Sequence, residues 1–204
     1  MTSSSNPAVT AAGHEVERFA SSAGRYLGYV VVAFSAALLV VIVLEDAGAQ
    51  AFCFVAAAGL LGWVAMVRPA ASLRANGVLL QNMLRDTFVP SSKIVRCYVS
   101  PMLQVATDDR RFACVGVSRS TVSRLRENSG RRKGGLFGSR TPEPEAPKYA
   151  EVAVGGHYTD YVVSRILGAA ADAEGDDREP VVAFAWPAVA ALAAAVVLVV
   201  LAFV

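Results

Sequence analysis

Three long apolar stretches dominate the pattern of the sequence. Residues 26–44, 47–67 and 181–204 contain no Asp, Glu, Lys, Arg or His. Each stretch reaches or approaches the ~20 residues that a helix needs to cross ~30 Å of hydrocarbon. The pattern therefore predicts three transmembrane helices over these ranges.

Between the second and third stretches, apolar and polar residues alternate with a period of two, which is typical of half-buried β-strands. Ala71, Leu73 and Ala75 begin this pattern, and Asn76-Gly77 is a strong signal for a tight hairpin turn. A returning strand is expected over residues 78–85, with a short continuation over 87–89. The later strands are expected to present three apolar faces: Val95, Cys97 and Val99; Leu103 and Val105; and Ala113, Val115 and Val117. The pattern predicts an antiparallel meander.

The alternation ends at residue 117. Residues 118–148 combine basic residues, glycines and three closely spaced prolines, so we expect a flexible insertion there. A helix is expected from about Thr159 to Ala171, because Asp160 suits its positive end and apolar residues form one stripe along it. The stripe consists of Tyr158, Tyr161, Val162 and Ile166.

Charges next to the apolar stretches predict the topology. The short loop between the first two stretches contains Glu45 and Asp46 and has no Lys or Arg. Basic residues flank the hairpin on its other side: Arg18 and Arg25 before it, and Arg68, Arg74 and Arg85 after it. By the positive-inside rule, the N-terminus and the β-rich region are expected in the cytoplasm, and the C-terminus outside the plasma membrane.

The predicted organisation has five parts: a disordered cytoplasmic N-terminus (1–25), a transmembrane hairpin (26–44 and 47–67), a mainly-β cytoplasmic domain (68–173), an acidic linker (174–180) and a third transmembrane helix (181–204). A cleaved signal with Ala47-Gly48-Ala49 as its cleavage site is the alternative for the first stretch. Its apolar region would be longer than the 7–15 residues usual in signals, and a second stretch follows at once.

Several short motifs in residues 68–117 carry a family resemblance. They are Arg68-Pro69, Asn76-Gly77-Val78, Gln81-Asn82-Met83-Leu84-Arg85, Val89-Pro90, Lys93-Ile94-Val95, Leu103-Gln104-Val105 and Arg110-Arg111-Phe112. In this ensemble the chain resembles the bacterial pleckstrin-homology-like (PH-like) family named for the low molecular weight protein antigen 6. The resemblance implies two membrane helices followed by a partly open antiparallel barrel of two sheets, closed at one end by a helix. It brings no catalytic residues.

The net charge of +2 conceals a basic segment, because residues 110–140 contain nine Lys or Arg against the single acid Glu127. Near an anionic leaflet, each basic residue contributes about 1 kcal/mol of attraction. The candidate lipid- or partner-binding residues are Arg119, Arg124, Arg126, Arg131, Arg132, Lys133 and Arg140. The alternatives are a loop that is only solvated, and one whose charge is regulated by phosphorylation at Ser118, Ser120, Thr121 or Ser123.

The sequence contains no HExxH, GxSxG or GxxxxGK[ST] motif, so we expect no enzyme. Cys97 and Cys114 lack metal-ligand spacing and are expected to be buried thiols, and no metal or cofactor is expected. Nucleic acid is not expected as a partner, because the basic segment lacks the repeated aromatic residues on which successive bases stack. The pattern favours a noncatalytic membrane-anchored interaction or scaffold protein whose partners are the lipid bilayer and a membrane protein. Homo-oligomers, anionic-lipid sensing by residues 119–140 and an accessory role in a transport complex are alternatives, although no stretch holds an ionisable residue for a transport path.

Overall fold

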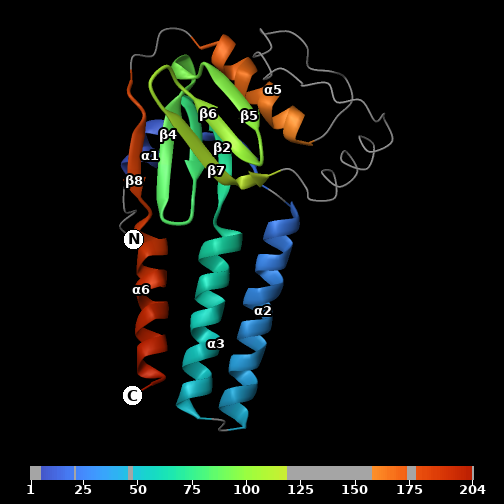
Figure 1. Cartoon of the computed structure of the whole chain (residues 1–204), viewed down its shortest axis with the longest axis vertical. Coiled ribbons are helices and arrows are strands. Elements are labelled where there is room, and N and C mark those ends of the chain that lie inside the picture. The colour runs from blue at the N-terminus through green and yellow to red at the C-terminus, as the bar shows by residue number, and fades with distance from the viewer. Residues whose placement is uncertain (1–5, 21, 46–47, 119–157, 174–177, 204) are drawn as a thin grey trace, which may run out of the picture.

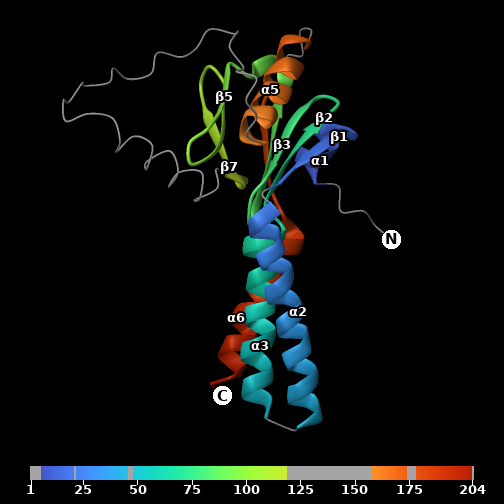
Figure 2. The ribbon, with the colours of Figure 1, turned by 90° about the vertical axis from the view of Figure 1, so that its right-hand side faces the viewer.

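The computed structural model describes residues 6–20, 22–45, 48–118, 158–173 and 178–203. Two layers stand out in Figures 1 and 2: a bundle of long apolar helices and a β-rich region at one end of it. Nearly all of the predicted insertion, from residue 119 on, and its seven candidate basic residues lie outside the described residues.

Three helices lie side by side in the bundle, with α3 between α2 and α6 (Figure 1). They are α2 (Ser22–Leu44), α3 (Ala49–Gly62), which continues into a π-helical turn η1 (Trp63–Val67), and α6 (Trp186–Leu201). The segments Gly24–Leu44 and Ala49–Val67 are long and apolar enough to cross a membrane. The sequence therefore located both of these helices correctly.

The third apolar stretch is not one helix, which corrects the predicted span at 181–204. Its first residues form strand β8 (Val181–Phe184), and the helix begins only at Trp186. Pro187 lies in the first turn of α6, where a proline is tolerated because it has no N–H to pair. The preceding residues Val-Val-Ala-Phe pair with an open sheet edge, and apolar runs alone do not distinguish such a strand from a buried helix.

Small residues let α2 and α3 approach closely. A Cβ atom built on Gly62 would lie 2.7 Å from Val31 Cγ1, and one on Gly59 would lie 3.1 Å from Ser35 Cβ. At the other end of the contact, a Cβ atom on Gly28 would lie 2.8 Å from Met66 Cβ. The helices therefore pack through glycines, as small residues at helix interfaces commonly allow.

The β-rich region contains two antiparallel sheets. The first has the order β1-β2-β3-β4-β8 and the second has the order β5-β6-β7. The remaining strands are β1 (Glu15–Phe19), β2 (Ala70–Arg74), β3 (Gly77–Gln81), β4 (Arg85–Pro90), β5 (Arg96–Val99), β6 (Met102–Ala106) and β7 (Arg111–Ser118). The predicted meander is present, with added strands at both edges of the first sheet.

The predicted hairpin at Asn76-Gly77 joins β2 to β3, and Arg74 pairs with Gly77 across it. A Cβ atom on Gly77 would lie 2.2 Å from the Val89 carbonyl oxygen, so glycine is required by the close approach of β4. The predicted single strand over 78–85 was wrong. The chain turns after Gln81, and the backbone N–H of Asn82 donates to the Arg85 carbonyl as β4 begins.

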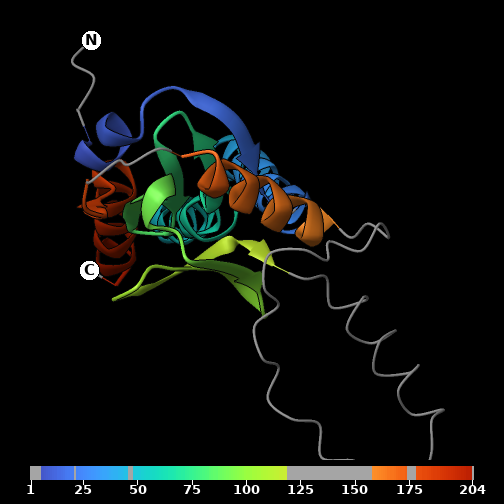
Figure 3. The ribbon, with the colours of Figure 1, turned by 90° about the horizontal axis from the view of Figure 1, so that it is seen from above.

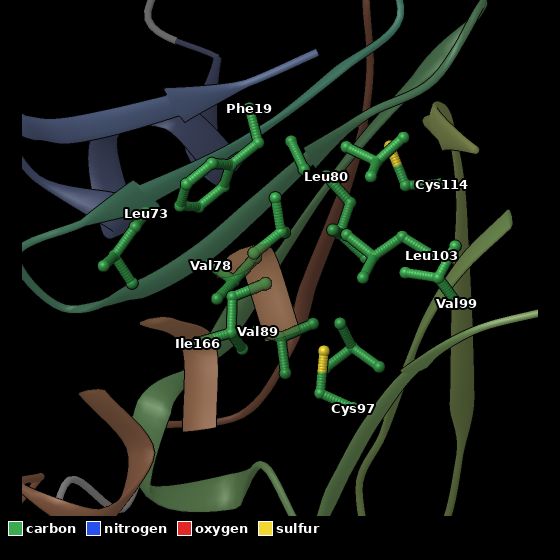
Figure 4. Packing of buried hydrophobic residues seen from close by; sticks show 14 of the residues in the cluster. Phe19, Leu73, Val78, Leu80, Val89, Cys97, Val99, Leu103, Cys114 and Ile166 are labelled. Carbon is green, nitrogen blue, oxygen red and sulfur yellow. The ribbon is translucent and has the colours of Figure 1, made fainter. Parts of the chain in front are cut away.

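The main core lies between the two sheets and is covered by helix α5 (Tyr158–Ala171), whose buried side chains are Thr159, Val162 and Ile166. Figure 4 shows Val78, Leu80 and Val89 facing Cys97 and Leu103 across this core. Seen from above, α5 lies between β1 and the second sheet (Figure 3). A helix was expected here, but Tyr158 and Tyr161 of the predicted apolar stripe are about half exposed.

The last strand, β7, corrects a predicted face. Its pairing with β6 contains an irregularity, because Met102 pairs with Ser118 while Leu103 pairs with Cys114. Cys114 and Val117 are therefore both buried, whereas Val115 is 47 % exposed. A bulge of this kind interrupts the period of two before Val117, so the alternation of the sequence gave the wrong facing for Ala113 and Val115, which are both exposed.

The N-terminal segment was predicted to be disordered over 1–25, and its described part is not. Helix α1 (Pro7–Ala12) begins with Asn6 as its cap and packs its alanines on Leu79 and Phe88, on the outer face of the first sheet. Strand β1 pairs with β2 and places Phe19 in the main core. The segment is short and charged, so its own pattern is weak, and pairing with a sheet edge far along the chain determines its structure.

Candidate functional site

Cationic and aromatic side chains gather where the three helices meet the β-rich region. We call this set the junction collar, and it comprises Arg25, Tyr26, Tyr29, Trp63, Arg68, Arg85 and Trp186. The helix packing places them at one level, because Gly28 of α2 lies against Met66 and Val67 of η1. On the other side, Val64 packs with Ala185 and Ala188 at the start of α6.

Arg68 and Asp86 form a nearly buried ion pair at the centre of the collar. Arg68 Nη2 donates to Asp86 Oδ1 at 2.6 Å, and the side chains are only 12 % and 5 % exposed. Asn6 Nδ2 donates to the other carboxylate oxygen at 2.7 Å, and Arg68 Nη1 donates to the Met83 carbonyl at 3.1 Å. The pair therefore fastens the end of η1 to β4 and to the N-terminal segment, and both charges are compensated.

A pocket of about 310 Å³ lies beside this ion pair. Its wall includes Trp63 and Trp186 from the two helix ends, together with Phe184 and Asp86. Arg85 lies over the Phe184 ring with its guanidinium carbon 5.2 Å from the ring centre, which is a cation–π distance. The pocket combines amphipathic aromatic rings with charge, a combination enriched at membrane–water interfaces.

Arg25 occupies the other side of the collar and differs from Arg68 in its partners. Its Nη2 donates to Tyr29 Oη at 3.2 Å, while its Nε is buried without a hydrogen-bond partner. Among the described residues, no carboxylate lies within ion-pair distance of Arg25. A second pocket, of about 280 Å³, is lined by Ala20, Arg25, Tyr26 and Tyr29. Within the described part of the chain, this guanidinium therefore has no carboxylate partner, and it lies beside a pocket.

A separate polar cluster fastens β1 to α5. Glu17 accepts hydrogen bonds from Tyr161 Oη at 2.8 Å and from Arg165 Nε at 3.1 Å. The hydrogen bond to Glu17 raises the pKa of Tyr161, and the same carboxylate raises the pKa of Arg165. Both side chains therefore hold their protons more firmly, which suits a structural contact.

The cysteines of the core offer no reactive thiol at neutral pH. Burial raises the pKa of Cys97 to about 12 and that of Cys114 to about 11. Cys114 Sγ donates to the Ala70 carbonyl at 3.4 Å, and all three cysteines are free. Within the described ranges, no cluster of His, Cys, Asp or Glu has the arrangement of a metal site.

The sequence did not predict the junction collar as a site. It used Arg25, Arg68 and Arg85 as topology signals, and Arg68 and Arg85 also as parts of the motifs that carry the resemblance. It placed its candidate binding residues between 119 and 140, outside the described part of the chain. The available signal was the spacing of Arg25, Tyr26 and Tyr29, which share one face of a helix at i, i+1 and i+4. Comparisons with protein-family models, with curated proteins and with solved structures found no match.

Proposed function

We propose that the protein is a noncatalytic, membrane-anchored interaction or scaffold protein, whose β-rich domain is held at the cytoplasmic face of the plasma membrane. In this proposal α2, α3 with η1, and α6 each cross the bilayer, and the chain ends outside. The domain then meets a membrane-protein partner at a fixed height above the lipid.

The observation that carries the proposal is the outward apolar surface of the helices. Only 11 % of the apolar window of α2 and 17 % of that of α3 are buried inside the structure, whereas a core helix of a soluble protein is mostly buried. Large side chains point outward along α2 and α6, among them Phe34 at 63 %, Val43 at 66 % and Val200 at 57 % exposed. Apolar surface of this extent requires lipid or another apolar partner.

The junction collar supports the orientation. Its tryptophans and tyrosines lie at the domain end of the helices, together with Arg25, Arg68 and Arg85, as expected for a cytoplasmic interface. At the opposite end, the α2–α3 connection carries Glu45 and Asp46 in the sequence. Residues 186–201 span roughly 24 Å as a helix, so α6 requires a small local adjustment of the bilayer.

The position of β1 argues against a cleaved signal. Cleavage near Gly48 would remove α2, β1 and Phe19, which is 1 % exposed in the main core. It would also leave the β2 edge unpaired. Because β1 pairs with β2, the residues before α2 and the residues after α3 lie on the same side of the bundle, as a membrane hairpin requires.

The arrangement of the domain supports the PH-like interpretation. Two antiparallel sheets enclose one core, and a helix that follows the last strand of the meander covers it. The sheets approach where the backbone N–H of Val115 donates to Asn82 Oδ1 at 3.2 Å, and Asn82 Nδ2 donates to the Ala113 carbonyl at 2.8 Å. β1 and β8 are additions to the meander at the edges of the first sheet.

Two other functions remain as alternatives. The basic segment 119–140 would sense anionic lipid if its charges lay against the leaflet. An accessory role in a transport complex would instead use the outward faces of α2 and α6 as protein contacts.

Alkaline carbonate extraction tests the membrane placement, and photo-crosslinking tests the interaction role. We expect the chain to stay in the pellet after carbonate, and a photoreactive residue at Tyr98 or Val115, exposed on the second sheet, to crosslink to one discrete protein. The same residue at Val43 should crosslink mainly to lipid. Release into the supernatant would overturn the membrane placement, and only lipid adducts at all three positions would overturn the interaction role.

A further inference from the structure

The pocket beside Arg25 has the chemistry of a phosphate site at the edge of the bilayer. Arg25, Tyr26 and Tyr29 line it from the first turns of α2, and Ala20 closes it from the end of β1. Ala20 is itself fixed, because its backbone N–H donates to Tyr158 Oη of α5 at 3.1 Å. The wall of the pocket is therefore attached to the domain as well as to the helix.

Among the described residues, the guanidinium of Arg25 has more N–H donors than acceptors. It has five N–H bonds, of which one is used on Tyr29, and its Nε is buried and unpaired. A buried donor without an acceptor is costly, and an oxyanion that draws the guanidinium toward the pocket would supply acceptors. The phenol groups of Tyr26 and Tyr29 add two further donors on the same face.

The surroundings of the pocket select a lipid over a soluble anion. Val30 lies one turn beyond Tyr26 along α2 and is 63 % exposed, so an apolar surface continues from the pocket toward the far end of the helix. Tyr26 is 72 % exposed and carries both an apolar ring and a polar tip. A phospholipid matches both the polar pocket and the apolar surface, because its phosphate would lie at Arg25 and its acyl chains would lie along α2.

We propose that Arg25, Tyr26 and Tyr29 bind the phosphate of an anionic phospholipid from the leaflet next to the domain. The inference rests on the proposed membrane placement and differs from lipid sensing by residues 119–140, because the site is built on α2. Arg68 does not serve in the same way, since Asp86 already neutralises it. Occupancy would fasten the start of α2, and through Ala20 and Tyr158 the helix α5, to the lipid.

The test uses the full-length protein in nanodiscs of phosphatidylcholine with a minor fraction of photoactivatable phosphatidylglycerol. Crosslinked peptides are mapped by mass spectrometry. We expect adducts on the peptide around Arg25, and we expect Arg25→Gln to lower their yield by about tenfold, the ratio that one charge-assisted hydrogen bond supports. Arg25→Lys should retain much of the yield, Tyr29→Phe should lower it less, and glycerol phosphate should not compete.

Arg96→Gln is the matched control, since Arg96 is an exposed arginine on β5 in the second sheet. An equal loss of adduct yield in this variant would mean that the effect depends only on the net charge of the protein, and it would overturn the proposed site. Equal labelling by phosphatidylcholine would overturn the preference for an anionic lipid, and competition by glycerol phosphate would assign the pocket to a soluble anion. If the wild type stays in the carbonate pellet and still gives no adduct at α2, this inference fails while the proposed membrane placement stands.

Discussion

Phe19→Ala tests whether the residues before α2 are part of the domain core. Phe19 is 1 % exposed, lies among the core residues of both sheets and meets the Tyr161 ring edge-on at 6.5 Å between ring centres. Truncating a buried phenylalanine typically costs about 3–5 kcal/mol, because both the transfer free energy and the packing around the ring are lost. The loss is a large share of the ~5–15 kcal/mol that usually stabilises a domain.

Thermal unfolding of the purified protein in mild detergent, followed by circular dichroism, measures the effect. Val16→Ala is the matched control, because Val16 belongs to the same strand and is 53 % exposed. We expect the control to change the free energy of unfolding by less than about 0.5 kcal/mol. Equal stability of the two variants would refute the assignment of β1 to the core, and with it the argument that the residues before α2 and after α3 share one side.

Three further predictions address the bundle, the ion pair and the thiols. Gly62→Leu should weaken α2–α3 packing by about 1–3 kcal/mol in detergent unfolding, because Val31 lies in the way, whereas Gly24→Leu meets open space and should not. Asp86→Ala should cost about 3–5 kcal/mol by leaving Arg68 buried and unpaired, and the double variant Asp86→Leu with Arg68→Met should recover most of it. In a Cys53→Ala background, Cys97 and Cys114 should resist iodoacetamide at pH 8 until the protein is denatured. Because folding raises both pKa values above the ordinary 9.0, their contribution to stability is full below pH 9 and should fall as the pH rises toward 11–12.

The sequence predicted the elements whose signal is local. Two uncharged stretches of about 20 residues identified α2 and α3 with η1, and Asn76-Gly77 identified the β2–β3 turn. The prediction failed where pairing at a distance decides the structure. Glu15–Phe19 becomes a strand because β2 offers it an edge, and Val181–Phe184 becomes a strand because β4 does. A local sequence pattern does not show where in the fold a sheet edge is available for pairing.

The candidate site was missed for a related reason. Arg25, Trp63 and Trp186 belong to three separate helices. The sequence shows Arg25 as a flank of one apolar stretch, and Trp63 and Trp186 as members of the other two. They lie at the same end of the bundle because α2 and η1 pack at Gly28 and because α6 starts beside Val64. The candidate binding residues were predicted in the basic segment 119–140 instead, because its charges lie close together in the sequence.

The connections between sheet and helices limit how the domain moves. β1 ends at Phe19 and α2 begins at Ser22, η1 ends at Val67 and β2 begins at Ala70, and only Ala185 separates β8 from α6. All three connections leave the first sheet, so this sheet cannot rotate freely against the bundle. The second sheet carries no such connection and is joined through the core and through Asn82. A partner at the second sheet would therefore contact a surface held at a fixed distance from the helix bundle. A force applied to the second sheet would be transmitted through the core to the first sheet, and from there to all three helices.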